Sequence, residues 1–183
     1  NELGIPVIES PVKMGEHRQF PFRELNPYAA IPVAQWRGHT LYESEAILSF
    51  IAEQFPEQRF EVTPGEASRA EYLSWRAISA STLESKLVEY ALAGQGLLPT
   101  EIQPLTEKTI AFKLRIVLEQ LPKSGFLVAE RLTLADISLA YSLRLSISTK
   151  FILFEQVAHY FEPLMARPAA KKADFFKSIE PFC

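Results

Sequence analysis

Glu43 and Ser44 come directly before a segment whose apolar residues recur at three- and four-residue spacing from Ile47 to Phe55. Serine is a favoured N-cap residue, so we expect Ser44 to cap a helix that begins there. The start of a helix offers backbone N–H groups and positive dipole charge to a carboxylate, and the neighbouring Glu43 offers a carboxylate to an ammonium group. The pair predicts a site for the amino-acid end of a ligand, and the alternative is a helix cap beside a solvated glutamate.

A β-hairpin is predicted directly before this helix. Asn26-Pro27 marks a turn, because the residue before a proline is disfavoured in the α region. β-rich residues then run from 31 to 36, with Pro32 near the start of the strand, where no ladder hydrogen bond is lost. Arg37-Gly38-His39 can return the chain to a second strand at 40–43.

These stretches resemble a known family. The run L-N-P-Y-A-A-I-P-V-A at 25–34 and the run L-Y-E-S-E-A-I-L-S-F-I-A-E at 41–53 are similar to the glutathione-binding half of cytosolic glutathione S-transferases, in a bacterial-type form. The resemblance implies that the peptide bond before Pro32 is cis and that Ile31 offers its backbone to the cysteinyl part of glutathione. It also implies that Glu43 and Ser44 hold the γ-glutamyl end. Ala30 departs from the pattern, since many relatives carry a glutamine there that touches glutathione.

The loop at 15–18 has the sequence Gly-Glu-His-Arg, which resembles the G-E-H-K of plant-type and several bacterial transferases. In those proteins the basic pair binds the glycine carboxylate of glutathione. Arginine can meet a carboxylate with two hydrogen bonds. His17 and Arg18 are therefore candidate glutathione-binding residues, and the alternative is a pair of solvated loop charges.

Composition excludes several classes of function. The chain has 183 residues, 48% hydrophobic and 22% charged, with a net charge of -3, so it can bury a sizeable core but has no basic surface for nucleic acid or an anionic membrane. Cys183 is the single cysteine, which excludes a disulfide framework and indicates a reducing, cytoplasmic location. His17, His39 and His159 lack metal-ligand spacing, so we expect no metal.

The resemblance implies an α+β fold of two domains. We expect a thioredoxin-like domain (βαβ-α-ββα) at 1–56, a linker at 57–65 and an all-helical domain at 66–183. In the family, Leu-Gly-Ile-Pro, found here at 3–6, ends the first helix. We therefore expect the first strand and most of the first helix to lie outside this sequence. Residues 6–12 are β-rich and are expected to form the family's second strand.

The second half reads as helix throughout. We predict a long helix at 66–92 and another at 105–121. Thr133 and Asp136 have capping-box spacing before a further apolar run, which gives them a structural role. The apolar positions expected to face the core of the two helices are Leu73, Ala77, Ala80, Leu83, Leu87 and Ala91, then Ile110, Leu114, Val117, Leu118 and Leu121. Four aromatic residues are core residues or contacts to a second substrate: Tyr90, Phe175, Phe176 and Phe182.

The function implied by the resemblance is transfer of the glutathione thiolate, with glutathione as co-substrate, to a small hydrophobic electrophile, in a homodimer. The family's catalytic Tyr, Ser or Cys follows the first strand, so no catalytic residue is assigned in this sequence. One alternative is a non-catalytic binding module of the kind found in translation-factor subunits and stress proteins. Another is a glutathione-dependent reductase or peroxidase on the same scaffold. The presence of Arg18, Ile31-Pro32, Glu43 and Ser44 favours the transferase.

Overall fold

A computed structural model describes residues 1–13, 15–123 and 125–182, so the inference drawn from Cys183 lies outside the described residues. The chain divides into two compact units, Leu3–Glu61 and a second unit of Asn1–Glu2 with Val62–Cys183. The division at 1–56, 57–65 and 66–183 stays a prediction. We call the two units the hairpin unit and the helical unit.

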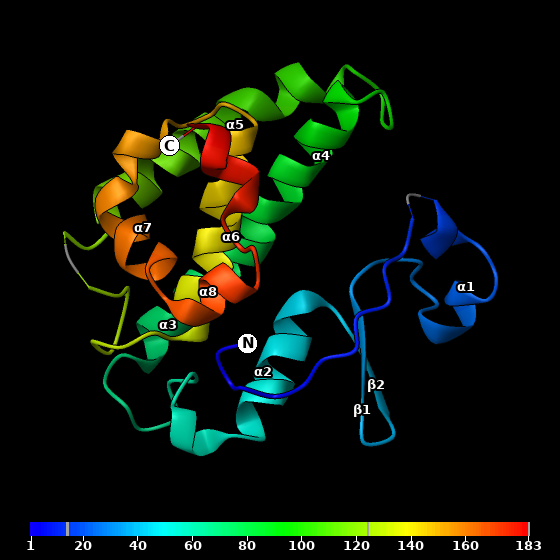
Figure 1. Ribbon diagram of the computed structural model, residues 1–183. Coiled ribbons are helices and arrows are strands. Elements are labelled where there is room, and N and C mark those ends of the chain that lie inside the picture. The colour runs from blue at the N-terminus through cyan, green and yellow to red at the C-terminus, as the bar shows by residue number, and fades with distance from the viewer. Residues whose placement is uncertain (14, 124, 183) are drawn as a thin grey trace. The chain divides into compact units, whose positions relative to one another are not determined.

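The hairpin unit holds one sheet and a few short helices (Figure 1). Its strands are short, and α2 is its longest helix. In chain order its elements are a 3₁₀ turn Glu16–Arg18, α1 Phe22–Leu25, β1 Val33–Trp36, β2 His39–Tyr42, α2 Ser44–Glu53 and a 3₁₀ turn Pro56–Gln58.

Strands β1 and β2 pair antiparallel, with Val33 opposite Tyr42 and Trp36 opposite His39. Two residues connect them, Arg37 with φ 46° and Gly38 with φ 86°. Positive φ at both loop positions is the conformation of a type I′ turn, whose twist matches that of the flanking strands. The sequence prediction of a hairpin here is confirmed, with His39 placed inside the second strand.

The prediction of a strand at 6–12 is wrong. No described residue of this segment is in a strand, and the side chains of Val7 and Ile8 are 65% and 95% exposed. A strand is stabilised by a neighbour that accepts and donates its ladder hydrogen bonds. In the described part of the chain β1 and β2 pair with each other, and neither pairs with residues 6–12.

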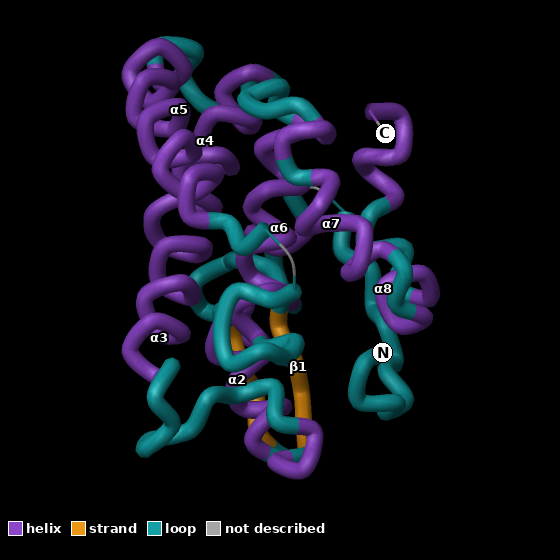
Figure 2. The backbone as a smooth tube through the Cα atoms, turned by 90° about the vertical axis from the view of Figure 1, so that its left-hand side faces the viewer, coloured by secondary structure: helices purple, strands orange, loops and turns teal. Residues whose placement is uncertain are grey.

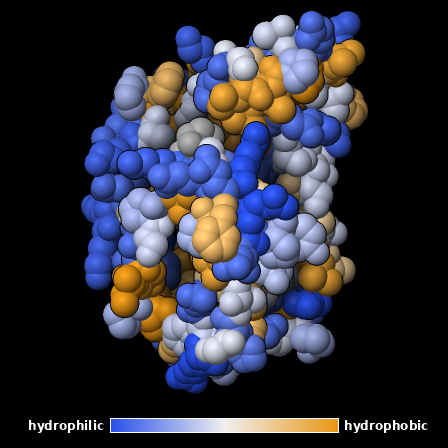
Figure 3. All heavy atoms as spheres, turned by 90° about the vertical axis from the view of Figure 1, so that its right-hand side faces the viewer, coloured by the Kyte–Doolittle hydropathy of each residue, from blue (hydrophilic) through white to orange (hydrophobic). Residues whose placement is uncertain are grey.

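The side of the molecule drawn in Figure 3 carries separate apolar patches among mostly hydrophilic side chains. Several of the large apolar residues of the hairpin unit are exposed. They are Val7, Ile8, Phe20, Tyr28 and Ile31.

The helical unit is built around α6, Leu134–Ser148 (Figure 2). Its Leu139, Leu143 and Ile147 are at most 2% exposed, and it packs against α3, α4 and two other segments of the unit. The remaining elements are α3 Arg69–Ala77, a π-helical segment Ile78–Glu84, α4 Ser85–Gly94, α5 Ile102–Gln120, a 3₁₀ turn Phe154–Gln156, α7 Ala158–Met165, α8 Pro168–Lys172 and a 3₁₀ segment Lys177–Phe182.

Helix α3, the π segment and α4 follow one another without a break, where one long helix is predicted. The face predicted for its first half is wrong, because Leu73 is 49% exposed and the buried positions are one residue earlier, at Tyr72 and Arg76. At Leu83 and Leu87 the prediction holds, since both are fully buried, whereas Ala91 is half-buried and Ala93 is the buried residue at the end of α4. A π segment takes more residues per turn than an α-helix. The apolar positions on its two sides therefore do not follow a single 3.6-residue spacing.

Asp136 closes the start of α6. Its Oδ2 accepts hydrogen bonds from the Thr133 N–H (2.9 Å) and hydroxyl (3.0 Å), and its Oδ1 accepts from the Leu127 N–H (2.9 Å) and the Tyr160 hydroxyl (3.1 Å). The side chain is fully buried, and this burial raises the pKa of the Asp136 carboxyl above its usual range. The four donors compensate for the loss of water around the carboxylate.

Candidate functional site

The open end of the β1–β2 hairpin brings two predicted site segments together. Val33 is opposite Tyr42 in the last pair of the ladder, so Pro32 and Glu43, the residues next to this pair, both leave the sheet at its open end. The Ile31–Pro32 peptide bond is cis, as the resemblance implies. Four candidate ligand-binding residues that are distant in sequence therefore lie at one edge of the sheet.

Glu43 links β2 to α2 in an unusual backbone conformation, with φ 71° and ψ 121°. Positive φ is uncommon for a residue with a side chain, and such residues cluster at functional sites. The helix begins at Ser44, so Glu43 occupies the N-cap position and the prediction that Ser44 is the N-cap is wrong. The reason is that the backbone leaves the helical region at Glu43, one residue earlier than the sequence suggests.

The start of α2 has the properties of an anion site. Its first intrahelical hydrogen bond runs from the Ile47 N–H to the Glu43 carbonyl (3.0 Å), so the Ser44 N–H lies before the hydrogen-bonded ladder. No side chain caps this end of the helix within the described residues. Ser44 is half-buried and the Glu43 carboxylate is exposed, so a ligand carboxylate and a ligand ammonium group would find partners side by side.

Asn26 is a site residue that sequence analysis missed, since it was interpreted only as part of a turn. It is 1% exposed, and its side chain donates to the Ala30 carbonyl (2.8 Å) and accepts from the Tyr28 N–H (3.0 Å). These two bonds fix the loop at 27–30, including Ala29 at φ 53°. The loop leads directly into Ile31, which is 57% exposed. Asn26 therefore positions the Ile31 backbone. The sequence signal is an asparagine in a turn, since asparagine side chains often bond the backbone two residues on.

A contact between Tyr28 and Tyr42 ties the same loop to the sheet. Their rings meet edge to face with centroids 5.8 Å apart, a geometry that aromatic pairs favour. Tyr42 ends β2 immediately before Glu43, so this contact ties the loop before Ile31 to the strand that leads to Glu43.

His17 and Arg18 lie in the 3₁₀ turn Glu16–Arg18, with His17 half-buried and Arg18 exposed. The turn is held by a hydrogen bond from the Lys13 N–H to the Glu16 carboxylate (2.9 Å). Within the part of the chain that the structure describes, no hydrogen bond or ion pair joins either basic side chain to the Pro32–Glu43 edge. Both side chains keep their donors available for a ligand.

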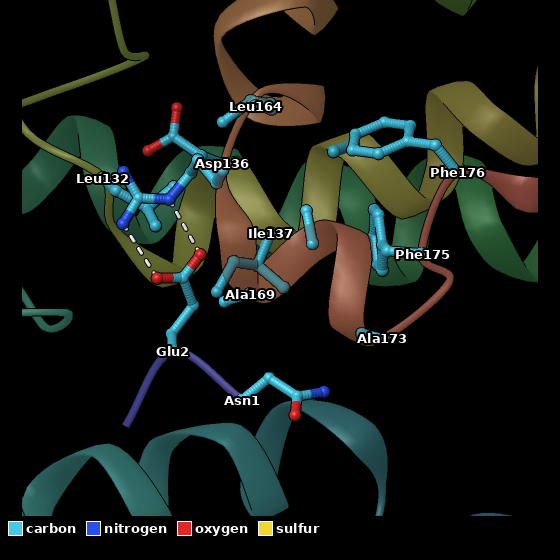
Figure 4. A pocket seen from close by; sticks show the side chains of 13 residues that line it. Asn1, Glu2, Leu132, Asp136, Ile137, Leu164, Ala169, Ala173, Phe175 and Phe176 are labelled. Carbon is cyan, nitrogen blue, oxygen red and sulfur yellow. Dashed lines mark hydrogen bonds and ion pairs between the residues drawn. The ribbon is translucent and has the colours of Figure 1, made fainter. Parts of the chain in front are cut away.

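The four candidate aromatic residues of the helical unit do not form one cluster. Phe176 is buried in the core at 7% exposure, Tyr90 packs against Phe151 with ring centroids 4.8 Å apart, and Phe182 is 40% exposed. Phe175 and Phe176 line a cavity of about 160 Å³ beside α6 and α8 (Figure 4). Arg167 and Glu2, which also line this cavity, form two hydrogen bonds with each other, at 2.7 and 2.8 Å.

Among residues 1–13, 15–123 and 125–182, no group of three or more His, Cys, Asp or Glu side chains is arranged to hold a metal ion. The same residues include no helix with the length and apolarity needed to cross a membrane.

Comparison with known proteins finds similarity to glutathione S-transferases. Residues 1–54 match the family model described as glutathione S-transferase, N-terminal domain. A glutathione S-transferase of Hyoscyamus muticus is 24% identical, over 96% of this chain and 88% of its own length. Glutathione S-transferase 3 of Zea mays is 27% identical, over 94% and 83%.

Solved structures show the same fold. The glutathione transferase URE2P6 of Phanerochaete chrysosporium, solved in complex with oxidised glutathione, superposes with a TM-score of 0.77 at 24% identity, over 93% of this chain and 84% of that one. Glutathione transferase F7 of Populus trichocarpa gives 0.67 at 25% identity, over 91% and 85%. The chain is thus similar to glutathione S-transferases along most of its length, residues 1–54 match their N-terminal domain, and the predicted α+β fold class is confirmed. The bacterial-type assignment and the missing first strand stay predictions.

Proposed function

We propose that the chain is a glutathione transferase that binds glutathione at the open end of the β1–β2 hairpin. The observation that supports this proposal is the register of the hairpin, which pairs Val33 with Tyr42, so the cis Ile31–Pro32 bond and the start of α2 both adjoin the open end of the sheet. An extended peptide can pair with the exposed Ile31 backbone, as an added strand pairs with a sheet edge.

Each end of glutathione has a partner of opposite charge. The Glu43 carboxylate binds the ammonium group of the γ-glutamyl residue, and the Ser44 hydroxyl and the N–H groups that begin α2 bind its carboxylate. His17 and Arg18 bind the glycine carboxylate. Held in this way, the cysteinyl thiol reacts as the thiolate with a small hydrophobic electrophile, because the thiolate is the nucleophile.

Calorimetric titration of glutathione into the full chain tests the site. We expect binding by the wild-type chain, and a large loss of affinity in the double variant Glu43→Ala, Ser44→Ala. The variant Glu53→Ala, at the other end of α2, is the matched control and keeps wild-type affinity. A folded wild-type chain that does not bind glutathione would overturn the proposal.

Turnover separates the transferase from its rivals. We expect the loss of the electrophile's leaving group to depend on glutathione and on Glu43 and Ser44. Glutathione binding without any conjugation would favour the binding module. Oxidation of glutathione with reduction of a peroxide or disulfide, instead of conjugate formation, would favour the reductase or peroxidase.

The proposed assembly is a homodimer. In the helical unit Leu73 on α3 is 49% exposed, an apolar side chain available to a second copy. Sedimentation equilibrium measures the mass, and Leu73→Glu is expected to favour the monomer. A wild-type chain that sediments as a monomer at all concentrations would contradict the dimer.

A further inference from the structure

The guanidinium group of Arg144 on α6 lies over two aromatic rings of the helical unit. Its guanidinium carbon is 5.0 Å from the ring centroid of Tyr141 and 4.5 Å from that of Phe175. Its Nη1 donates a hydrogen bond to the Phe175 carbonyl. All three residues are half-buried, so the charge is held in place and still reaches solvent.

Most of the hydrogen-bonding capacity of Arg144 is unused. A guanidinium group has five N–H donors, and in the described part of the chain only Nη1 has a recorded acceptor. The guanidinium carbon lies over the rings of Tyr141 and Phe175, and these contacts use none of the N–H donors. A carboxylate binds a guanidinium group through its N–H donors, so the donors other than Nη1 are the ones proposed to bind it.

Two other half-buried arginines of the helical unit, Arg131 and Arg167, are paired with carboxylates. Arg167 donates to Glu2 at 2.7 and 2.8 Å, and Arg131 donates to Glu66 at 2.9 and 3.1 Å. Among the described residues, Arg144 has no carboxylate partner. A partly buried cation of this kind binds an anion more strongly than an exposed one, because water screens the charge less.

We propose that Arg144 and the Tyr141 hydroxyl form a binding site for the carboxylate of an apolar or aromatic acid. The Tyr141 hydroxyl is protonated and able to donate, because burial and the charge of Glu84 raise the pKa of Tyr141 above its usual value. This site lies within the helical unit and does not depend on the glutathione site of the proposed function.

The surroundings of Arg144 select the rest of the ligand. Phe175 both stacks on Arg144 and lines the cavity of about 160 Å³ in Figure 4. Ile137 and Ala140 of that cavity lie four residues before Tyr141 and Arg144, and therefore on the same side of α6. A ligand whose carboxylate binds Arg144 thus has apolar and aromatic surface next to it. A small inorganic anion would use only the charge.

The first test uses two probes of equal shape on the full-length chain without glutathione. 2-Naphthoate carries the carboxylate, and 2-naphthamide replaces it by a neutral amide. Isothermal calorimetry is expected to show binding of naphthoate that is at least roughly tenfold tighter than that of naphthamide. Equal affinity for the two probes, or no binding of naphthoate, would overturn the proposal.

Substitutions then assign the site. Arg144→Met keeps a long side chain without charge and is expected to lose roughly tenfold or more in naphthoate affinity, with little effect on naphthamide. Arg144→Lys keeps the charge but loses the planar donors, so an intermediate loss is expected, and Tyr141→Phe removes one donor.

Arg115→Met is the matched control. Arg115 also lies over an aromatic ring, that of Phe112 at 5.5 Å, but its side chain is 64% exposed and pairs with Glu119 at 3.7 Å. This variant is expected to bind naphthoate like the wild type. If Arg144→Met fails to fold, the Lys and Phe variants decide. Wild-type naphthoate affinity in both Arg144→Lys and Tyr141→Phe would overturn the proposal, as would an equal loss of affinity in Arg115→Met. Either result would show that Arg144 has only a structural role, in holding the segment at Phe175.

Discussion

The Ser142 hydroxyl of α6 donates a hydrogen bond to the Ser79 carbonyl of the π segment, across 3.0 Å. Both residues are fully buried, so no water competes for this bond. The contact joins two helical segments 63 residues apart at the place where one of them changes its winding.

Ser142→Ala is expected to lower the free energy of unfolding by roughly 1–3 kcal/mol, because it leaves a buried carbonyl oxygen without this donor. Ser146→Ala is the matched control. Ser146 is equally buried, but its hydroxyl bonds the Ser142 carbonyl of its own helix (2.8 Å), so its loss is expected to cost less. Urea unfolding of the two variants measures the difference. Equal losses of unfolding free energy in the two variants would show that the bond between the two helical segments contributes no more to stability than a bond within one helix.

Asn26→Ala is expected to disorder the loop at 27–30 and to weaken glutathione binding, since it removes both hydrogen bonds that hold the loop. Asn26→Asp keeps the acceptor for Tyr28 and loses only the donor to Ala30, so we expect a smaller loss. Hydrogen exchange of residues 27–31 measures the loop, and calorimetry measures binding. Gln54→Ala, which removes an exposed bond to Phe50, is the control. Unchanged exchange in Asn26→Ala would contradict the positioning role.

Ser44→Ala is expected to weaken glutathione binding by roughly 1–3 kcal/mol, because the hydroxyl would bond a charged carboxylate. Since Glu43 and not Ser44 occupies the N-cap position, the substitution is expected to change the melting temperature little. Titration calorimetry and thermal unfolding are measured on the same sample. Lowered stability with unchanged affinity would instead identify Ser44 as a structural residue only.

The lowered pKa of Glu66 makes the free energy of unfolding depend on pH in the acid range. The hydrogen bond from the Thr63 N–H, followed by the contact with Arg131, holds the pKa of Glu66 at about 2, below its ordinary value of 4.5. Since the folded pKa is lowered, the unfolded chain binds the proton more readily. The contribution of Glu66 is therefore complete above the unfolded value and is lost as pH falls from about 4.5 toward 2.

Glu66→Gln removes that titration, so we expect it to flatten the acid limb of a plot of unfolding free energy against pH. Glu71→Gln, an exposed substitution on α3, is the control and is expected to keep the wild-type profile. Parallel acid limbs in wild type and Glu66→Gln would contradict the assignment.

Features set by nearby residues could be predicted from the sequence. The hairpin, the helix that follows it and the cap of α6 depend on the turn at Arg37-Gly38 and on the spacing of Thr133 and Asp136. Their signals are local, because turn conformation and capping bonds form within a few residues. The strand predicted at 6–12 failed for the opposite reason. Strand formation depends on a pairing strand elsewhere in the chain, whereas β-propensity describes single residues and does not show whether such a strand is present.

Two further features escaped the sequence analysis because polar side chains do not identify their own partners. Arg76 and Ser79 are buried, although their residue types predict exposure. The cluster around Arg144 joins α6 to Phe175, 31 residues later in the chain. A contact over that sequence separation produces no periodic pattern in the sequence. The N-cap was predicted at Ser44, one position too late. Glutamate rarely adopts positive φ, so its residue type gives no sign that the backbone does so at Glu43.

The two-residue turn at Arg37 and Gly38 lies at the closed end of the hairpin, away from the proposed ligand groups. Its length nevertheless sets the register of the strands and therefore the alignment of those groups. Strands of four residues are too short to correct a shift by pairing elsewhere. A single residue inserted at the turn would move Glu43 out of step with Pro32 and turn alternate side chains to the other face. The tolerance of this turn to insertions is thus limited by the alignment of residues at the other end of the hairpin. Lengthening the turn is a way to abolish ligand binding while every binding residue remains in the chain.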